Sequence, residues 1–272
     1  LTLDRKIIAS CEVERERMGL PRDVWFVCLH VREGGYKGDW ENIRNADIGN
    51  YLVAIKEITQ RGGWVVRLGD PTMTKLPILD QVIDYPFHPG RSAIMDVYLL
   101  KECSLCISTS SGILDTAILL GKPVVMTNSV QWNNGVPLRR GDLEIFKHVY
   151  SRTEKRFLSL QEWLMRASNI ASEDWSSPDW SLVENSEEEI MNVVKERLDF
   201  SDHQGPTYLQ QEFRKAHLCA AHELSKTFRF DSNDVENCNE WFRFASRMLA
   251  WRGEISAGFL EKNWRKSSRM PN

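Results

Sequence analysis

The stretch KECSLCISTSSGILDTAILLGKPVVMTN, residues 101–128, decides the fold. Its apolar run at 104–108 is typical of a buried strand, the next turn is made of small residues, and a short helix is expected over 113–120. A second buried strand is expected over 123–126. Strand, turn, helix and strand in this order form one repeat of an α/β fold.

The turn of this repeat, Ser110, Ser111 and Gly112, leaves backbone N–H groups exposed at the start of the helix. These groups lie at the positive end of the helix dipole, so the turn can receive a phosphate or carboxylate without a cationic side chain. The alternative is a plain N-cap, in which Ser111 only satisfies the first turn of the helix.

The preceding part of the chain repeats the alternation of strands and helices. Near-continuous apolar runs indicate strands buried on both faces of a parallel sheet. Strands are expected over 24–29, 64–68 and 82–85, and helices over 48–59 and 92–102. The predicted fold class is therefore α/β, with a Rossmann-like parallel sheet.

Polar residues and glycines follow each predicted strand. In an open parallel sheet the ligand binds outside the carboxyl ends of the strands, so these residues are the candidates for a binding site. They are His30, Arg32, Glu33 and Gly34 after the first strand, Arg67, Gly69 and Asp70 after the second, Tyr85, Pro86 and His88 after the third, Thr109, Ser110, Ser111 and Gly112 after the fourth, and Thr127 and Asn128 after the fifth.

The overall composition favours a small-molecule ligand. The 272 residues include 35 basic and 38 acidic side chains, for a net charge of -3, so the chain as a whole has no nucleic-acid footprint. No apolar run approaches the roughly 20 residues that span a bilayer, and the start does not resemble a signal peptide. These features predict a cytoplasmic protein with no membrane span.

The six cysteines are scattered along the chain, and we expect them to be reduced thiols that are mostly buried. Cys103 and Cys106 form one CxxC, but a zinc site needs a second pair or matching histidines. His217, Cys219 and His222 do not supply it, because a spacing of five residues turns the two histidines apart on a helix. No metal site is predicted.

Three regions are expected along the chain: an N-terminal helix or linker at 1–20, the Rossmann-like domain at 21–200 and a helical C-terminal extension at 201–272. A last strand is expected at 143–150, with helices at 158–171 and 187–198. Aromatic and methionine side chains spaced three and four residues apart predict helix packing in the extension; they are Trp241, Phe244, Met248 and Trp251. Because the chain starts at Leu1 with a charged helix, we expect either a missing N-terminal domain or a homodimer.

Charged residues near the turn add to its capacity for a phosphate. Arg32 offers a planar fork that fixes a phosphate by two parallel hydrogen bonds. Asp96 can brace the loop after the first strand or reach a ribose hydroxyl. Asn45 is expected to cap the helix that follows, and Arg44 is either solvated or a contact for the acceptor or sugar.

Together these motifs resemble the nucleotide-sugar-binding half of GT-B-fold glycosyltransferases. Protein O-fucosyltransferases share a pattern matched by His30, Arg32, Asp39 and Trp40, and a second one matched by Asp96, Leu99, Leu100, Ser110 and Ser111. A bacterial family of GT-B glycosyltransferases resembles the segments LHVRE, IRNADIGNY, VVRLGD, VIDYP and CISTSSGI followed by GKPVVMTN.

This resemblance implies an inverting, metal-independent transfer of a sugar from a nucleoside diphosphate to a glycan, lipid-linked or peptide acceptor. It implies no cofactor beyond the donor. Arg32 would neutralise the leaving diphosphate, and His30, Glu33 and Asp39 are candidates for the base. The donor would contact residues at the other strand ends, namely Arg67, Asp96, Thr109, Ser110, Ser111 and Gly112. Unlike the fucosyltransferases, this chain inserts residues 33–36 and carries Gly112 where they have an aromatic residue.

Two other classes fit the same residues. One is a nucleotide-sugar-binding module without turnover, and the other is a related group transferase or epimerase, such as a polysaccharide pyruvyl transferase. A dinucleotide dehydrogenase is disfavoured because no GxGxxG follows the first strand.

Overall fold

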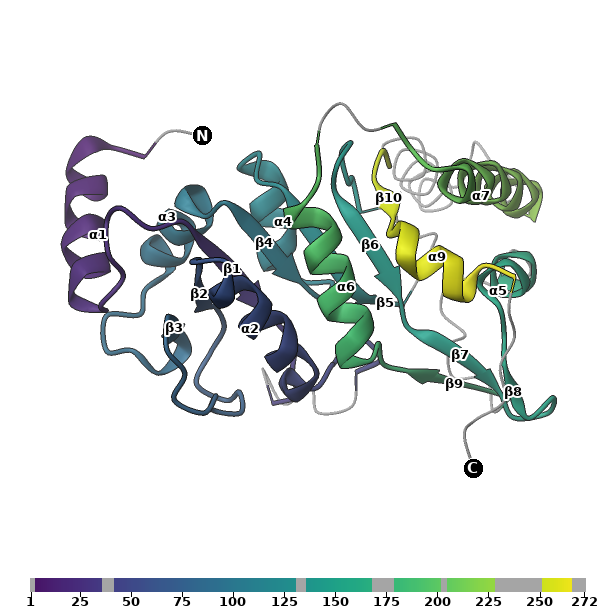
Figure 1. Cartoon of the computed structure of the whole chain (residues 1–272), viewed down its shortest axis with the longest axis horizontal. Coiled ribbons are helices and arrows are strands. Elements are labelled where there is room, and N and C mark those ends of the chain that lie inside the picture. Colours follow the sequence, from purple (N-terminus) through teal and green to yellow (C-terminus); the bar gives the residue numbers. More distant parts are fainter. Residues whose placement is uncertain are drawn as a thin grey trace, which may run out of the picture. The chain divides into compact units, whose positions relative to one another are not determined.

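The computed structural model describes residues 3–35, 42–130, 136–167, 179–201, 205–227 and 251–265. The chain forms two compact units (Figure 1), which are described separately below. Unit 1 comprises 1–128 and 186–198, and unit 2 comprises 129–185 and 199–272. The domain limits expected from the sequence, at residues 20 and 200, remain a prediction.

Unit 1 is built on a parallel sheet whose strands follow the order β5-β4-β1-β2-β3. The order matches the five-strand half of a Rossmann fold, which confirms the α/β class and the Rossmann-like sheet expected from the sequence. All four residues of β4 and all five of β1 are buried, as the continuous apolar runs predicted. The strands are β1 (Phe26–His30), β2 (Trp64–Arg67), β3 (Val82–Asp84), β4 (Leu105–Ser108) and β5 (Val124–Ser129).

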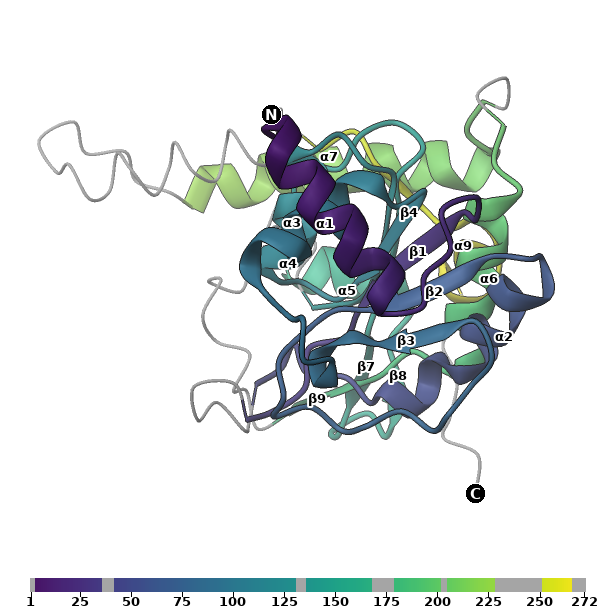
Figure 2. The same cartoon turned by 90° about the vertical axis from the view of Figure 1, so that its left-hand side faces the viewer.

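The helices of unit 1 form two groups. α2 packs on α6, which returns from much later in the chain, and α3 packs on α1 and α4 (Figures 1 and 2). The two groups cover opposite faces of the sheet, as right-handed crossovers on either side of β1 require. The helices are α1 (Arg5–Arg17), α2 (Leu52–Gln60), α3 (Ala93–Glu102), α4 (Gly112–Leu119) and α6 (Glu187–Leu198), with 3-10 turns η2 (Ile48–Tyr51) and η3 (Tyr85–Phe87).

Side-chain caps set the helix starts in unit 1. Ser92 caps α3 and Ser111 caps α4, each accepting a hydrogen bond from the backbone N–H three residues on. The expected cap at Asn45 is wrong, because Asp47 takes this role and accepts from the Gly49 N–H at 2.7 Å. The Ala46 N–H donates to the Arg32 carbonyl at 2.9 Å, so the chain at 45–46 is still held to the loop after β1.

Unit 2 contains a short parallel pair and a small antiparallel sheet. The single strand expected over 143–150 is in fact two strands, because β6 and β7 belong to different sheets. The predicted helical extension contains α7 and α9, and also the short strand β10, which pairs with β6. The strands are β6 (Leu143–Phe146), β7 (His148–Ser151), β8 (Arg156–Phe157), β9 (Trp180–Val183) and β10 (Glu254–Ile255), and the helices are α5 (Leu160–Ala167), α7 (Tyr208–Thr227) and α9 (Ala257–Asn263).

Aromatic side chains fill the core of unit 2. Phe213 of α7 packs against Phe146, Trp251 and Trp264 at ring-centroid distances of 5.7–6.3 Å. Trp251 therefore packs in the core, but it lies outside the helices of the described residues and not on a helical stripe; Trp241, Phe244 and Met248 lie outside the described residues. The predicted helix end at 168–171 lies outside them as well.

A helix that crosses a bilayer must be both long and strongly apolar, and none of the helices in the described ranges meets both conditions.

A buried polar cluster ties the helices of unit 1 to the end of β5. The Tyr51 hydroxyl lies 2.7 Å from the Thr127 hydroxyl and accepts a hydrogen bond from Asn128 Nδ2 at 3.0 Å. All three residues are buried, and Asn128 adopts a φ of 52°, which few residues other than glycine tolerate. The hydroxyl of Tyr51 therefore anchors this end of β5 through hydrogen bonds.

We expect Tyr51→Phe to lower the free energy of unfolding by about 1–2 kcal/mol, because it removes a buried hydrogen-bond partner of Thr127 and Asn128. Urea denaturation would measure the change. Tyr208→Phe is the matched control, since Tyr208 is 67% exposed. Equal stability of the two variants would contradict the structural role of the Tyr51 hydroxyl.

Glu144 of β6 carries a buried carboxyl group that contacts the Trp251 side chain. Trp251 Nε1 donates to Glu144 Oε2 at 3.3 Å. Burial raises the pKa of Glu144 from its ordinary value of 4.5 to about 7, although the bond from Trp251 acts in the opposite direction. Folding thus favours the protonated form of this carboxyl group.

Its contribution to stability should therefore be greatest at low pH and be lost as the pH rises through about 7. In the wild type we expect the free energy of unfolding to fall by on the order of 1 kcal/mol per pH unit between pH 5 and 7. Glu144→Gln should remove this decline. Urea denaturation over this pH range would show it. The exposed Glu187→Gln is the control and should keep the wild-type profile; a Glu144→Gln profile identical to wild type would exclude this assignment.

Candidate functional site

The order of the strands in unit 1 places a topological switch point between β1 and β4. From β1 the chain continues to β2 and β3 on one side, and from β4 it continues to β5 on the other. The register sets His30 opposite Ser108 at the carboxyl ends of these two strands. Open α/β sheets bind ligands in the crevice at this position. The candidate site therefore comprises the ends of β1 and β4 and the start of α4.

Three side chains form a hydrogen-bonded cluster at this point. His30 Nδ1 lies 3.1 Å from Ser111 Oγ and 3.4 Å from Ser108 Oγ, and the two serine oxygens lie 3.3 Å apart. The Ser108 hydroxyl also donates to the Thr109 carbonyl at 2.7 Å. His30 and Ser111 were predicted site residues. Ser108 was missed, because its position inside the strand gave no sign that its hydroxyl reaches the histidine.

His30 is neutral at physiological pH. Burial, followed by the nearby positive charges of Arg67 and Arg32, lowers its pKa from 6.5 to about 4. Only Asp70 acts in the opposite direction. The imidazole is therefore a hydrogen-bonding group in this site and not a source of positive charge.

Arg32 is held by its backbone on two sides. Its N–H donates to Thr109 Oγ1 at 2.9 Å, and the Thr109 N–H in turn donates to the His30 carbonyl at 3.1 Å. The Arg32 carbonyl accepts from the Ala46 N–H. The predicted residues Arg32 and Thr109 are therefore brought together, and the arginine is fixed beside the turn that opens α4.

The turn Ser110-Ser111-Gly112 forms the start of α4. Ser111 adopts an extended backbone and accepts from the Leu114 N–H at 3.5 Å, so it is the N-cap of this helix. A Cβ atom placed on Gly112 would meet nothing within 4 Å, so the side-chain position of this glycine is open space among the described residues. Ser111 thus has a structural role, as the alternative interpretation held, and it also contacts the imidazole.

Glu33 and Arg67 form the support beneath the loop after β1. Arg67 is fully buried and pairs with Glu33, with Asp84 at 3.1 Å and with the Thr74 carbonyl. The second oxygen of Glu33 accepts from the Thr74 N–H at 2.7 Å. This arginine therefore joins the ends of three strands, and the sequence did not reveal its partners because they lie far apart along the chain.

We expect Arg67→Met to lower the free energy of unfolding by about 3–5 kcal/mol, since it leaves two carboxylates beside each other without their cation. Urea denaturation would measure the loss. Arg17→Met is the matched control: the Arg17 side chain is 71% exposed in its pair with Glu14, and such pairs contribute less than about 1 kcal/mol. A loss at Arg67 as small as that at Arg17 would contradict the supporting role.

Asp96 lies in the first turn of α3, where burial raises its pKa against the opposing effect of Arg91. Within the described residues its Oδ1 atom is buried and makes no hydrogen bond. Its role toward a donor remains a prediction. Arg44 binds Asn42 Oδ1 through its backbone N–H and its Nε, both at 3.0 Å, and the candidate base Asp39 lies outside the described residues with Gly38 and Trp40.

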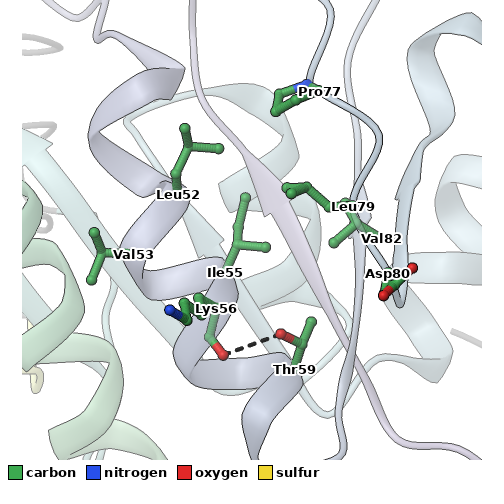
Figure 3. A pocket seen from close by; sticks show the side chains of 9 residues that line it. All are labelled: Leu52, Val53, Ile55, Lys56, Thr59, Pro77, Leu79, Asp80 and Val82. Atoms are coloured by element: carbon green, nitrogen blue, oxygen red, sulfur yellow. Dashed lines mark hydrogen bonds between the residues drawn. The ribbon is translucent and has the colours of Figure 1, made fainter.

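A separate pocket of about 380 Å³ lies between α2 and the segment that leads into β3 (Figure 3). Leu52, Ile55, Leu79 and Val82 give it apolar walls, and the polar side chains of Lys56 and Asp80 also line it. None of the residues that line it belongs to the switch point. It is therefore distinct from the candidate site.

Within the described ranges, no group of three histidine, cysteine, aspartate or glutamate side chains is placed so that it could hold a metal ion. The cysteines of this part are free thiols, and Cys28, Cys103 and Cys106 are buried around the centre of the sheet. Burial raises the pKa of the Cys106 thiol well above its ordinary value, so this sulfur is unreactive as a nucleophile.

No protein-family model matches this chain, and no curated protein matches it. Among solved structures it is similar to a glycosyl transferase family 9 protein from Veillonella parvula DSM 2008, at 14% identity and a TM-score of 0.35, over 46% of this chain and 36% of that one. It is similar to the ADP-heptose LPS heptosyltransferase II of E. coli, at 13% identity and 0.34, over 46% and 38%. A third is described as a putative UDP-N-acetylglucosamine 2-epimerase from Listeria monocytogenes, at 14% identity and 0.34, over 72% and 39%.

The chain thus spans less than two fifths of the length of each of these three structures. Identities of 13–14% and TM-scores of 0.34–0.35 do not assign it to any of these families.

Proposed function

We propose that the switch point of unit 1 binds the diphosphate of a nucleotide sugar, and that the protein is an inverting, metal-independent glycosyltransferase. The acceptor would be a glycan, a lipid-linked sugar or a peptide. The observation that carries this proposal is the backbone of Arg32, which Thr109 holds beside the N-terminus of α4, where Ser111 contacts His30 at the end of β1.

This arrangement suits a diphosphate because it combines two kinds of positive potential. The guanidinium group of Arg32 can give two parallel hydrogen bonds to phosphate oxygens. The backbone N–H groups at the start of α4 add the positive end of the helix dipole, and the open side-chain position of Gly112 leaves the backbone accessible there. Both act without a metal ion.

In the proposed reaction an acceptor hydroxyl oxygen attacks the anomeric carbon of the sugar. The bond from this carbon to the diphosphate oxygen breaks, and its electron pair stays on the leaving diphosphate. Arg32 and the α4 N-terminus stabilise the negative charge that develops there. The proton of the acceptor hydroxyl passes to a base.

The contacts of Glu33 and His30 bear on the choice of base. Both oxygens of Glu33 already accept hydrogen bonds, from Arg67 and from the Thr74 N–H. His30, with its pKa of about 4, is a weak proton acceptor at neutral pH. We therefore assign Glu33 to loop support and His30 to ligand positioning, and leave Asp39 as the remaining base candidate of this chain.

A nucleotide-sugar-binding module without turnover is the second candidate. It is favoured by the same contacts, because neither Glu33 nor His30 is well placed and well tuned to accept a proton. Transfer of sugar to any acceptor would show that the protein is an enzyme and not a binding module.

A thermal-shift screen against UDP, GDP, CDP, ADP and CMP tests the proposal. A ligand that binds only the folded protein raises the melting temperature. We expect one nucleoside diphosphate to do so and Arg32→Ala to abolish the shift, because the guanidinium contributes the charge that faces the diphosphate.

Arg17→Ala serves as the control and should keep the shift, since Arg17 lies on α1 with a 71% exposed side chain. The shift should also persist in EDTA. The absence of any shift, or a strict need for manganese, would contradict the proposal. A response to phosphoenolpyruvate but to no nucleotide would favour a group transferase of the pyruvyl class.

A further inference from the structure

The hydrogen atoms of the cluster at the switch point can be assigned from its distances. Ser108 is fully buried, and its hydroxyl donates to the Thr109 carbonyl at 2.7 Å; a carbonyl can only accept. A hydroxyl carries a single proton, so Ser108 has none left for its other contacts. It can act only as an acceptor toward Ser111 and His30.

The proton between the two serines must therefore come from Ser111, whose Oγ lies 3.3 Å from Ser108 Oγ. Ser111 then has no proton for the imidazole, 3.1 Å away. The proton in that contact comes from His30 Nδ1, which can also point toward Ser108 at 3.4 Å. The result is a one-way chain from Nδ1 through Ser111 and Ser108 to the carbonyl of Thr109.

The reverse assignment satisfies fewer contacts. If Ser111 donated to His30 Nδ1, no proton would remain between Ser111 and Ser108. The contact between Ser108 and the imidazole would then bring two lone pairs together. Buried polar groups are normally hydrogen-bonded, so the one-way chain is the better assignment.

We propose that this chain holds His30 in the tautomer protonated at Nδ1, so that Nε2 presents a bare lone pair as a hydrogen-bond acceptor for a ligand hydroxyl. The low pKa of His30 agrees with a neutral ring. Nε2 makes no hydrogen bond with any residue of the described ranges, and His30 keeps an exposed fraction of 8%, so the ring is not fully sealed.

This inference rests on the proposed function where it names the ligand. A bare nitrogen attracts a hydroxyl but repels the oxygens of a phosphate, which are acceptors as well. The crevice is thus divided: Arg32 and the start of α4 take the diphosphate, and His30 Nε2 takes a hydroxyl of the sugar. His30 is a positioning and specificity residue in this scheme.

NMR of the ligand-free protein, labelled with ¹⁵N-histidine, tests the tautomer at pH 7.5. Long-range ¹H–¹⁵N spectra distinguish the protonated from the bare ring nitrogen, and the signals of His30 are those lost in His30→Gln. We expect Nδ1 protonated and Nε2 bare. A ring protonated at Nε2 would overturn the proposal, as would a charged one.

Ser108→Ala supplies the sharper test. It removes the acceptor for the Ser111 proton, which can then turn to Nδ1, so we expect the His30 population to shift to the tautomer protonated at Nε2. Ser110→Ala is the matched control: it changes the neighbouring serine, which has no contact in the cluster, and should leave the tautomer unchanged. A wild-type tautomer in Ser108→Ala would show that the chain of hydroxyls does not set it.

Calorimetric titration of the same variants tests the ligand assignment, with the nucleotide chosen by the thermal-shift screen. Ser108→Ala should weaken binding of the nucleotide sugar about tenfold, the loss expected for one hydrogen bond, while the free nucleoside diphosphate binds as before. Equal weakening of both would overturn the hydroxyl assignment. If no nucleotide binds even the wild type, the proposed function fails and the hydroxyl assignment with it, whereas the NMR result still decides the tautomer.

Discussion

The parallel pairing of β1 with β4 is the constraint on which the candidate site depends. It sets His30 opposite Ser108 and brings the start of α4 against the loop of Arg32. Both strands are buried along their whole length. A shift of register would therefore require the core to repack around both strands, which disfavours it. The geometry of the site is therefore set by two fully buried strands of unit 1.

A second layer of interactions keeps the loops at this edge in place. Arg67 connects Glu33, Asp84 and the Thr74 carbonyl, which follow or flank three different strands. A guanidinium suits this position because its planar fork can bind several oxygens at once, which a lysine ammonium does less well. The cost of burying the charge is offset only while all partners are present. The loop after β1 is thus fixed by electrostatics as well as by its backbone bonds.

The sequence predicted the sheet and most residues at its carboxyl edge, because buried parallel strands leave continuous apolar runs and the residues after them are then known. His30, Arg32, Thr109 and Ser111 were found in this way. Ser108 was missed because its hydroxyl reads as part of the strand, and β10 because two residues give no periodicity. The cap was placed at Asn45 because Asn45 and Asp47 are both suitable caps. The structure places the cap at Asp47, and the Ala46 N–H just before it is bonded to the Arg32 carbonyl, a contact that the sequence does not reveal.

The charges and the hydroxyl chain act on His30 in complementary ways. Burial and the nearby arginines keep the ring neutral, and the donor chain through Ser111 and Ser108 fixes which nitrogen holds the proton. Burial, with a further contribution from the arginines, keeps the ring neutral but does not select a tautomer; the hydroxyl chain makes that selection. Arg32, to which we assign the diphosphate, is thus also one of the charges that keep the adjacent ring neutral, so that one cluster can distinguish the two halves of a nucleotide sugar.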